Sequence, residues 1–385
     1  MNKAAINIIG FESCCSCGLC QNTCPFNAIT MAQDDNGFFR PYIKKDLCTN
    51  CGLCAKTCPI IKKEPQISQN AVPQIVGCWS NDYTNVINSS SGGISFELAK
   101  AFIECGGYVC GVQWNNGVPV FEIATTINQL QDFRGSKYLQ PDTSDIYKRI
   151  QHEIRDGHKV LFLGLPCHVQ AISNYIKSDN LFCVDLVCAG VPSMLMYKKY
   201  CSETFGNAKI THVRFRAKEA GKPAPWRKYS LEFYSKEYLL KREYHGENPF
   251  FLAFNSTKVY NRACYTCEFN TIPRRGDLTL CDYWGVDSDQ ENINGTSLVL
   301  INSHRGEDLF NELTKKTGII STIEVVKKEA LEGTKRINLS NRNIPSNYNQ
   351  IFKILQKKGF YAMYKRYIKP SLLTRIFRRL GLVAE

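Results

Sequence analysis

The sequence predicts a mixed α/β domain that follows a small cysteine-rich domain and precedes a basic, helical extension. Three observations support this division. A cysteine pattern is repeated within residues 1–61, β-type and helical runs alternate through residues 75–335, and apolar residues recur at helical spacing in residues 336–385. The polar segment 62–74 carries two prolines, as is typical of a linker. The length of 385 residues suits such a multi-domain chain.

The amino-acid composition indicates a globular protein that is rich in cysteine. The chain is 44% hydrophobic and 22% charged, the balance of a protein that folds around a core. Its longest apolar run, residues 160–172, is too short to span a bilayer. No small-residue cleavage site precedes the first cysteines, so we expect no signal peptide and a cytoplasmic location. In a reducing compartment, 19 cysteines indicate metal ligation or redox chemistry rather than structural disulfides.

The cysteines of residues 1–61 form two copies of one motif, 34 residues apart. Each copy reads C-x2-C-x2-C-x3-C-P, the signature of bacterial ferredoxins with two 4Fe–4S clusters, in which the fourth cysteine of each run binds the other cluster. Two zinc sites are the alternative, because C-x2-C also binds zinc, but two runs that both end in Cys-Pro favour clusters. The predicted ligands are a first cysteine group, Cys14, Cys17, Cys20 and Cys58, and a second cysteine group, Cys24, Cys48, Cys51 and Cys54.

Residues 75–335 alternate between candidate strands and helices, as in an α/β domain. Strands are expected at 108–114, 121–125, 159–163, 181–187, 278–281 and 297–301. Helices are expected at 92–105, 143–156, 168–177, 193–205 and 305–315. Period-two alternation predicts an inserted antiparallel sheet at 212–216, 229–234 and 238–244.

Four cysteines of this domain stand at distinctive positions. Cys167 and Cys188 each follow a predicted strand, and Cys264 and Cys267 form a further C-x2-C motif. The ends of strands in an α/β sheet converge on a shared crevice, so Cys167 and Cys188 are expected to be neighbours. The C-x2-C loop can close over them. These four residues, the third cysteine group, are therefore a candidate site for a third cluster.

The same segments resemble the beta-subunit family of coenzyme F420 hydrogenases and dehydrogenases, which includes flavin-dependent iron–sulfur reductases. The matching motifs follow the family's order over roughly residues 75–330. They are Ser91-Gly92-Gly93, Gly135-Ser136-Lys137-Tyr138, Leu165-Pro166-Cys167, Cys188 with Gly190, Cys264-x2-Cys267 and Asp282-Tyr283-Trp284-Gly285. Two residues depart from the family pattern: His168 stands where Gln is common, and Cys281 where Gly is common.

The resemblance implies that residues 75–335 bind FAD, and that Cys167, Cys188, Cys264 and Cys267 hold a 4Fe–4S cluster. It also implies hydride transfer between a two-electron partner and the flavin. Ser91, Gly92 and Gly93 can present backbone N–H groups to a phosphate at a helix start, or simply cap that helix.

Each side chain expected near the flavin can have either a functional role or a purely structural one. Lys137, between Ser136 and Tyr138, can contact the flavin or its diphosphate, or be solvated. Arg274 and Arg275 can clamp the pyrophosphate, or form a solvated charge pair. His168 can donate a proton or bind the substrate, or only orient its loop. His168 and Lys137 are therefore the candidate catalytic residues. The candidate cofactor contacts among these side chains are Ser136, Lys137, Tyr138, Arg274 and Arg275.

The net charge of +13 is concentrated in two segments, 209–245 and 341–385. The first can receive an acidic substrate or be a solvated hairpin face. The second can dock on a membrane surface or a partner, or pack on the domain with a charged outer face. Because the basic residues are confined and no nucleic-acid motif is present, nucleic-acid binding is not expected. Seven cysteines are expected to be bystanders: Cys15, Cys78, Cys105, Cys110, Cys183, Cys201 and Cys281.

Together these features predict a cytoplasmic or membrane-peripheral oxidoreductase with FAD and 4Fe–4S clusters. It would pass electrons between a two-electron small molecule, F420-like or another, and a redox protein or a larger complex. The alternative is a non-catalytic, ferredoxin-type electron-transfer subunit of a larger complex.

Overall fold

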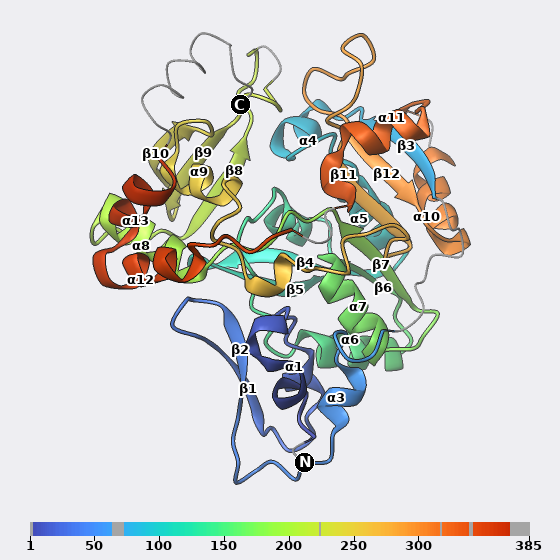
Figure 1. Cartoon of the computed structure of the whole chain (residues 1–385). Helices are drawn as coiled ribbons and strands as arrows, with labels where there is room; N and C mark the ends of the chain where they lie inside the picture. Colours follow the sequence, from blue (N-terminus) through green and yellow to red (C-terminus); the bar gives the residue numbers. More distant parts are fainter. Residues whose placement is uncertain (1–2, 64–72, 223–224, 316–317, 339–341, 370–385) are drawn as a thin grey trace.

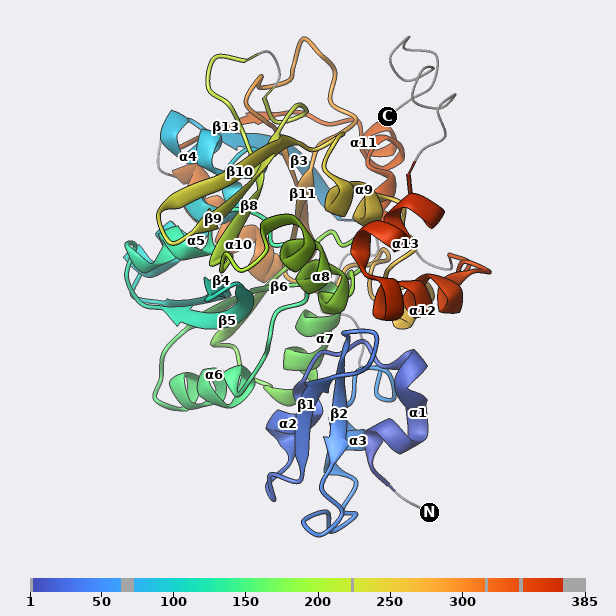
Figure 2. The ribbon, with the colours of Figure 1, turned by 90° about the vertical axis from the view of Figure 1, so that its left-hand side faces the viewer.

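The computed structural model of the chain has three parts that lie against one another (Figure 1). A small N-terminal domain lies below the larger α/β domain, and two C-terminal helices pack beside a small sheet of that domain. Figure 2 shows the same arrangement from the side. The structure describes residues 3–63, 73–222, 225–315, 318–338 and 342–369.

The N-terminal domain repeats the same local structure at each cysteine run. Helix α2 (Leu19–Thr23) begins directly after Gly18, and helix α3 (Leu53–Thr57) directly after Gly52. These glycines have φ of 74° and 75°, a left-handed backbone that other residues rarely adopt. The repeat seen in the sequence is therefore also a repeat of structure. The remaining elements are helix α1 (Ala5–Ser13) and the antiparallel strands β1 (Ile29–Gln33) and β2 (Phe39–Ile43).

The α/β domain is built on an eight-stranded sheet with a parallel centre and antiparallel flanks. In order across the sheet, the strands are β13 (Ile320–Ile323), β3 (Gln74–Ser80), β12 (Ser297–Ile301), β11 (Leu278–Asp282), β7 (Leu181–Leu186), β6 (Val160–Gly164), β4 (Tyr108–Asn115) and β5 (Val118–Ala124). Strands β11, β7, β6 and β4 run parallel to one another, and all other pairings are antiparallel. Every residue of β6 is buried, as expected for a strand covered on both faces.

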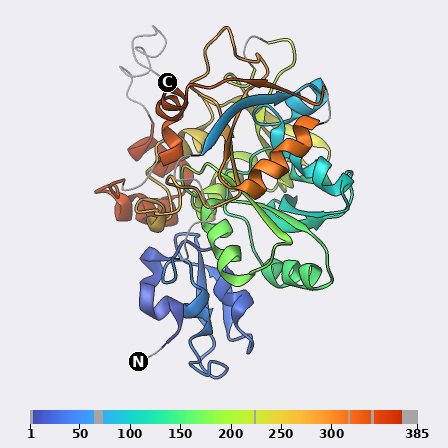
Figure 3. The same cartoon turned by 90° about the vertical axis from the view of Figure 1, so that its right-hand side faces the viewer.

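Helices cover both faces of this sheet. Helices α5 (Ile94–Glu104) and α10 (His304–Lys315) share a core with Leu161 of β6 on one face. Figure 3 shows α10, in orange, lying across the strands. Helices α6 (Ile146–Arg155) and α7 (Pro166–Tyr175) share a core with Phe162 on the opposite face, because neighbouring side chains of a strand point to opposite sides.

A second core surrounds the inserted antiparallel sheet of β8 (His212–Ala217), β9 (Ser230–Ser235) and β10 (Tyr238–Tyr244). Four helices pack there: α8 (Met194–Phe205), α9 (Pro249–Asn255), α12 (Tyr348–Lys358) and α13 (Phe360–Tyr367). The apolar stripe of the last two helices is buried in this core, with Ile351, Leu355 and Phe360 fully inaccessible. For the described residues, the C-terminal stripe thus packs on the domain. The part of the expected helical extension from residue 370 onward lies outside the described residues.

Every strand and helix expected between residues 92 and 315 is present, with ends within three residues of the expected ones. The sequence does not predict β3, β13, or the short helices α4 (Tyr83–Asn88), α9 and α11 (Lys327–Gly333). Strand β3 begins at Gln74, the last residue of the expected linker, and a glycine interrupts its apolar residues. Strand β13 has only four residues. None of the described helices combines the length and apolarity needed to cross a membrane.

Candidate functional site: three cysteine groups and a large pocket

The second cysteine group lines one small pocket at the far end of the N-terminal domain. Cys24 comes from the first run, and Cys48, Cys51 and Cys54 come from the second. Backbone N–H groups point at two of these sulfurs: Ala28 donates to Cys24 and Ala5 to Cys54, each at 3.4 Å. Such donors favour thiolate ligands of a cluster. Cys51 is exposed at the protein surface.

The first cysteine group is also brought together by the fold. Burial and then the neighbouring thiols of Cys17, Cys14 and Cys58 raise the pKa of Cys20. Burial, followed by Cys17, raises the pKa of Cys58 to about 12. The fourth cysteine of the second run therefore lies beside the first three of the first run, as in the ferredoxin exchange of ligands.

The spacing of these thiols bears on the kind of metal site. Among the described residues, no group of three or more His, Cys, Asp or Glu side chains lies at the spacing of a single metal ion. A 4Fe–4S cluster distributes four thiolates over four iron atoms, whereas a zinc site holds four ligands on one ion. The donor set of thiols, with N–H groups on the sulfurs, fits clusters.

The third cysteine group lines a pocket of about 250 Å3 between the two domains, here called the interdomain pocket. Cys167 is the second residue of α7 and follows β6, and Cys188 follows β7. Because β6 and β7 are parallel neighbours, both cysteines lie at the same edge of the sheet. Cys264 ends the short 3-10 helix η2 (Arg262–Cys264), and Cys267 follows it. Burial, then Cys188 and Cys267, raise the pKa of Cys264.

The N-terminal domain supplies one wall of the interdomain pocket. Ser13, Cys15, Ile60 and Lys63 all line it. Cys15, expected to be a bystander, thus lines the same pocket as Cys167. The third cysteine group is therefore enclosed only when both domains are in place.

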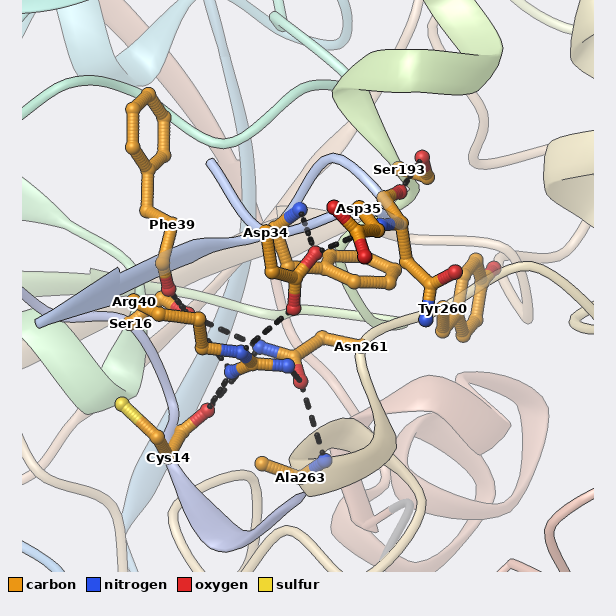
Figure 4. A network of polar contacts seen from close by, with 12 residues as sticks. Cys14, Ser16, Asp34, Asp35, Phe39, Arg40, Ser193, Tyr260, Asn261 and Ala263 are labelled. Carbon is orange, nitrogen blue, oxygen red and sulfur yellow. Dashed lines mark hydrogen bonds and ion pairs between the residues drawn. The ribbon is translucent and has the colours of Figure 1, made fainter. Parts of the chain in front are cut away.

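A buried network holds the two domains together beside these cysteines (Figure 4). Arg40 of β2 donates to the carbonyl of Cys14 at 2.8 Å and to Asn261 Oδ1 at 3.0 Å, and pairs with Asp34 at 3.0 Å. Asn261 donates in turn to the Cys14 carbonyl and to Ser16 Oγ, each at 3.2 Å. Asn261 immediately precedes η2. The network thus ties the first cysteine loop to the loop that carries Cys264.

The large pocket, of about 320 Å3, lies at the same edge of the sheet. The carboxyl ends of β6, β7 and β11 meet there with the start of α5 and the loop 134–139. Parallel sheets bind ligands at this edge. Cys188, Gly190 and Val191 line both this pocket and the interdomain pocket. One short segment therefore separates the two spaces.

The segment before α5 lines the large pocket only in part. Ser91 and Gly93 line it, and Gly93, the residue directly before the helix, has φ of 83°. Gly92 does not line it. Its N–H donates to Ser297 Oγ at 3.0 Å, and an added Cβ would meet the Cys78 carbonyl at 2.7 Å. A glycine is thus needed at position 92 because the backbone packs closely on the sheet, and Gly92 does not itself face the pocket.

Ser136, Lys137 and Tyr138 all line the large pocket. The N–H and hydroxyl of Ser136 each lie 2.9 Å from Ser90 Oγ, which joins this loop to the α5 start. Lys137 Nζ donates to the carbonyls of Asp132 and Arg134, at 3.1 and 3.0 Å. Burial lowers the pKa of Lys137 to about 7. Its amine is therefore poised to gain a proton when an anion binds nearby.

His168 is fully buried at the start of α7 and lines the large pocket. Within the described part of the chain, neither of its ring nitrogens has a hydrogen-bond partner. Burial lowers the pKa of His168 to about 4, so the ring is neutral near pH 7. Buried polar atoms are ordinarily hydrogen-bonded, so a ligand in the pocket would meet unsatisfied nitrogen atoms here.

Arg274 and Arg275 do not line the large pocket, contrary to their expected place at a pyrophosphate. Arg274 is fully buried and pairs with Asp185 at 3.1 Å, because a buried carboxylate needs a cation. Arg275 donates to Gln170 Oε1 at 3.2 Å and to the Glu268 carbonyl at 2.8 Å. Both cations lie on the side of the third cysteine group.

An ion pair in the wall of the large pocket leaves no signal in the sequence. Arg216 of β8 donates to Asp282 at the end of β11, and both line the pocket. Asp282 belongs to the Asp-Tyr-Trp-Gly motif, but no local pattern links Arg216 to it. Other cations of segment 209–245 are paired as well, Arg214 with Glu232 and Arg227 with Glu291. Three arginines of this segment are therefore neutralised by carboxylates.

The fold and the cysteine groups together define an iron–sulfur protein of the redox class. Residues 157–328 match the family of the C-terminal part of the coenzyme F420 hydrogenase/dehydrogenase beta subunit. Residues 13–60 match the 4Fe-4S dicluster domain. The resemblance expected from the sequence is confirmed over these residues: a match to the dicluster domain is followed along the chain by a match to the C-terminal part of this family.

The F420-reducing [NiFe] hydrogenase complex from Methanosarcina barkeri, in a xenon-derivatised structure, contains a chain similar to this one. The identity is 17% and the TM-score 0.48, over 70% of this chain and 92% of that chain. No curated protein matches this chain.

Proposed function

We propose that this chain is an oxidoreductase that holds FAD in the large pocket and a third 4Fe–4S cluster on the third cysteine group. The segment of Cys188, Gly190 and Val191, which lines both pockets, is the observation that carries the proposal. A ligand in the large pocket lies against the same segment that supplies a cluster ligand. Electron transfer between the two sites then needs no movement of either domain.

The third cysteine group fits a cluster in its chemistry. Four thiols converge from the start of helix α7 and from two loops, and the Gly190 N–H donates to Cys188 Sγ at 3.3 Å. Arg342 and Arg274 both lie near enough to lower the pKa of Cys188, although burial dominates and raises it to about 11. Nearby cations offset the negative charge of a thiolate-bound cluster.

The large pocket fits FAD by the groups that face it. The start of α5 presents backbone N–H groups, which favour a phosphate. Lys137 adds a cation, and the unsatisfied ring nitrogens of His168 await a polar partner. The volume of about 320 Å3 lies in the range of small-molecule sites.

Bound FAD supplies the exchange between two-electron and one-electron chemistry. The chain's own residues bind and orient it. Lys137 neutralises phosphate charge. The neutral ring of His168 accepts or donates a hydrogen bond at the flavin or the substrate. The two-electron substrate is a small molecule of the F420 type or another hydride carrier. The other partner is a redox protein or a larger complex, which would approach the exposed Cys51. Peripheral membrane contact through the C-terminal segment is part of the same proposal.

Cofactor content of protein purified under anaerobic conditions tests this function. Three clusters predict about twelve iron atoms per chain, together with one flavin. Eight irons without flavin would favour the alternative of a non-catalytic electron-transfer protein. Zinc in place of iron would contradict both functions. Mixing the purified protein with reduced deazaflavin, NADH, NADPH or reduced ferredoxin, and following the visible spectrum, then identifies the electron donor.

A further inference from the structure

Cys15 belongs to neither ferredoxin ligand group, but its side chain lies between two groups. It stands in the first cysteine run, between Cys14 and Cys17 of the first cysteine group. It also lines the interdomain pocket together with Cys167 of the third group. Cys15 therefore lies where the loop of the first group meets the third group across the two domains.

The backbone around Cys15 is held in place by side chains of the α/β domain. Gln140 Nε2 donates to the carbonyls of Cys15 and Ser16, at 3.3 and 2.8 Å. The hydroxyl of Tyr147 donates to the Cys17 carbonyl at 2.9 Å. Gln140 and Tyr147 are both buried. The position of the Cys15 thiol between the domains is thus fixed by contacts on both sides of it.

The neighbouring carbonyl is held in the same way. Arg40 and Asn261 both donate to Cys14, the residue before Cys15. Consecutive carbonyls of the loop from Cys14 to Cys17 therefore accept hydrogen bonds from buried side chains. A cysteine that merely filled space would not need its sulfur placed between two ligand groups by such a set of contacts.

We propose that Cys15 is the electron-transfer contact between the third cysteine group and the first, an inference that rests on the proposed function. One electron leaves the third cluster, which is oxidised, and arrives at the first, which is reduced. No bond forms or breaks, and Cys15 keeps its proton. A hydrogen bond to a ligand sulfur also raises the reduction potential of the cluster it reaches. Cys15 is therefore a positioning residue and not a ligand.

The test compares Cys15→Ala, Cys15→Ser and the control Cys105→Ser, in which an exposed cysteine outside all three groups is changed. Each holoprotein is titrated with a reductant while electron paramagnetic resonance follows each cluster. The potential of the third cluster is expected to fall in Cys15→Ala and to be largely retained in Cys15→Ser, whose hydroxyl still donates. The control should titrate as the unmodified protein does.

A kinetic measurement separates the sulfur from its hydrogen bond. After photoreduction of the bound flavin, we expect electrons to reach the ferredoxin clusters at least about tenfold more slowly in both Cys15 variants, because the bridging sulfur is gone from each. If Cys15→Ala fails to fold, Cys15→Ser alone still tests this rate.

Three results would overturn the inference. These are unchanged potentials in Cys15→Ala, unchanged transfer rates in both variants, and a loss of about four irons per chain, which would make Cys15 a cluster ligand. Failure of the proposed function is distinguishable, because it shows in the unmodified protein as missing flavin or as only about eight irons.

Discussion

The ferredoxin cysteines and the third cysteine group offer the same ligand atoms, but the chain assembles them in different ways. The first and second groups come from two short runs, and glycines at Gly18 and Gly52 allow each run to wrap tightly. The third group comes from two strand ends and a distant loop, and the N-terminal domain closes it. The comparison teaches that a cysteine group encoded in local spacing can form within one small domain, whereas a cysteine group encoded in topology depends on the whole fold.

The strongest way to break this comparison is to remove one ligand from each kind of site. Cys188→Ala should lower iron from about twelve to about eight atoms per chain and should also release the flavin, because Cys188 lines both pockets. Cys51→Ala should lower iron equally but keep the flavin, since Cys51 lies far from the large pocket. Iron assay and flavin absorbance measure both. Full flavin content in Cys188→Ala would show that the pockets are independent.

A substitution at Asn261 tests how much the contact between the two domains stabilises the protein. The buried amide of Asn261 donates to the first cysteine loop. Asn261→Ala removes the acceptor of one buried Arg40 N–H and the donor to the Cys14 carbonyl and Ser16 Oγ, and should lower the free energy of unfolding by about 2–4 kcal/mol. Anaerobic thermal unfolding measures the change. The control Asn349→Ala removes only an exposed hydrogen bond from Arg262 and should change stability by less than about 0.5 kcal/mol. Equal effects would argue against an interdomain role for Asn261.

The pH dependence of FAD affinity tests whether Lys137 binds the diphosphate in the large pocket. Burial lowers the pKa of Lys137 to about 7, and a bound diphosphate would raise it again. FAD affinity should therefore be greatest below about pH 7 and fall by up to about tenfold per unit as pH rises toward the pKa of the complex. Lys137→Met should bind FAD more weakly and lose this dependence. Equilibrium dialysis of the flavin across the pH range measures the affinity and its pH dependence. An unchanged pH profile in the variant would show that Lys137 does not contact the phosphate.

The smallest expected effect concerns His168. Burial lowers the pKa of His168 to about 4, whereas an unfolded chain binds this proton near pH 6.5. As pH falls from about 6.5 toward 4, the unfolded state takes up a proton that the folded state does not, so stability is lost. His168→Gln should remove about 1 kcal/mol of that loss at about pH 5.5. Thermal midpoints at about pH 7.5 and about pH 5.5 should show a smaller fall in this variant than in His304→Gln, which alters an exposed histidine.

The same contrast explains how much could be predicted from the sequence. The ferredoxin ligands follow from spacing, and β6 follows from a continuous apolar run, because both are local patterns. The neighbouring positions of Cys167 and Cys188 follow from the general geometry of parallel strands.

Contacts between distant segments could not be predicted in the same way. Arg274 turns inward because Asp185, far away in sequence, is buried beside it. Arg216 reaches the large pocket only because the inserted sheet packs against the end of β11. Cys15 gains its place only when the two domains meet. In each case the deciding partner is set by tertiary packing and leaves no signal within its own segment.

Cys51 is exposed, and it is the only exposed cysteine among the twelve of the three groups. Dioxygen and iron chelators therefore reach the second cysteine group first. Oxidative damage should begin at this outer end of the chain and advance inward, so that partly inactivated molecules keep an intact interior while losing contact with their partner. The same exposure that would let the proposed redox partner approach thus makes this end of the protein its most vulnerable point in air.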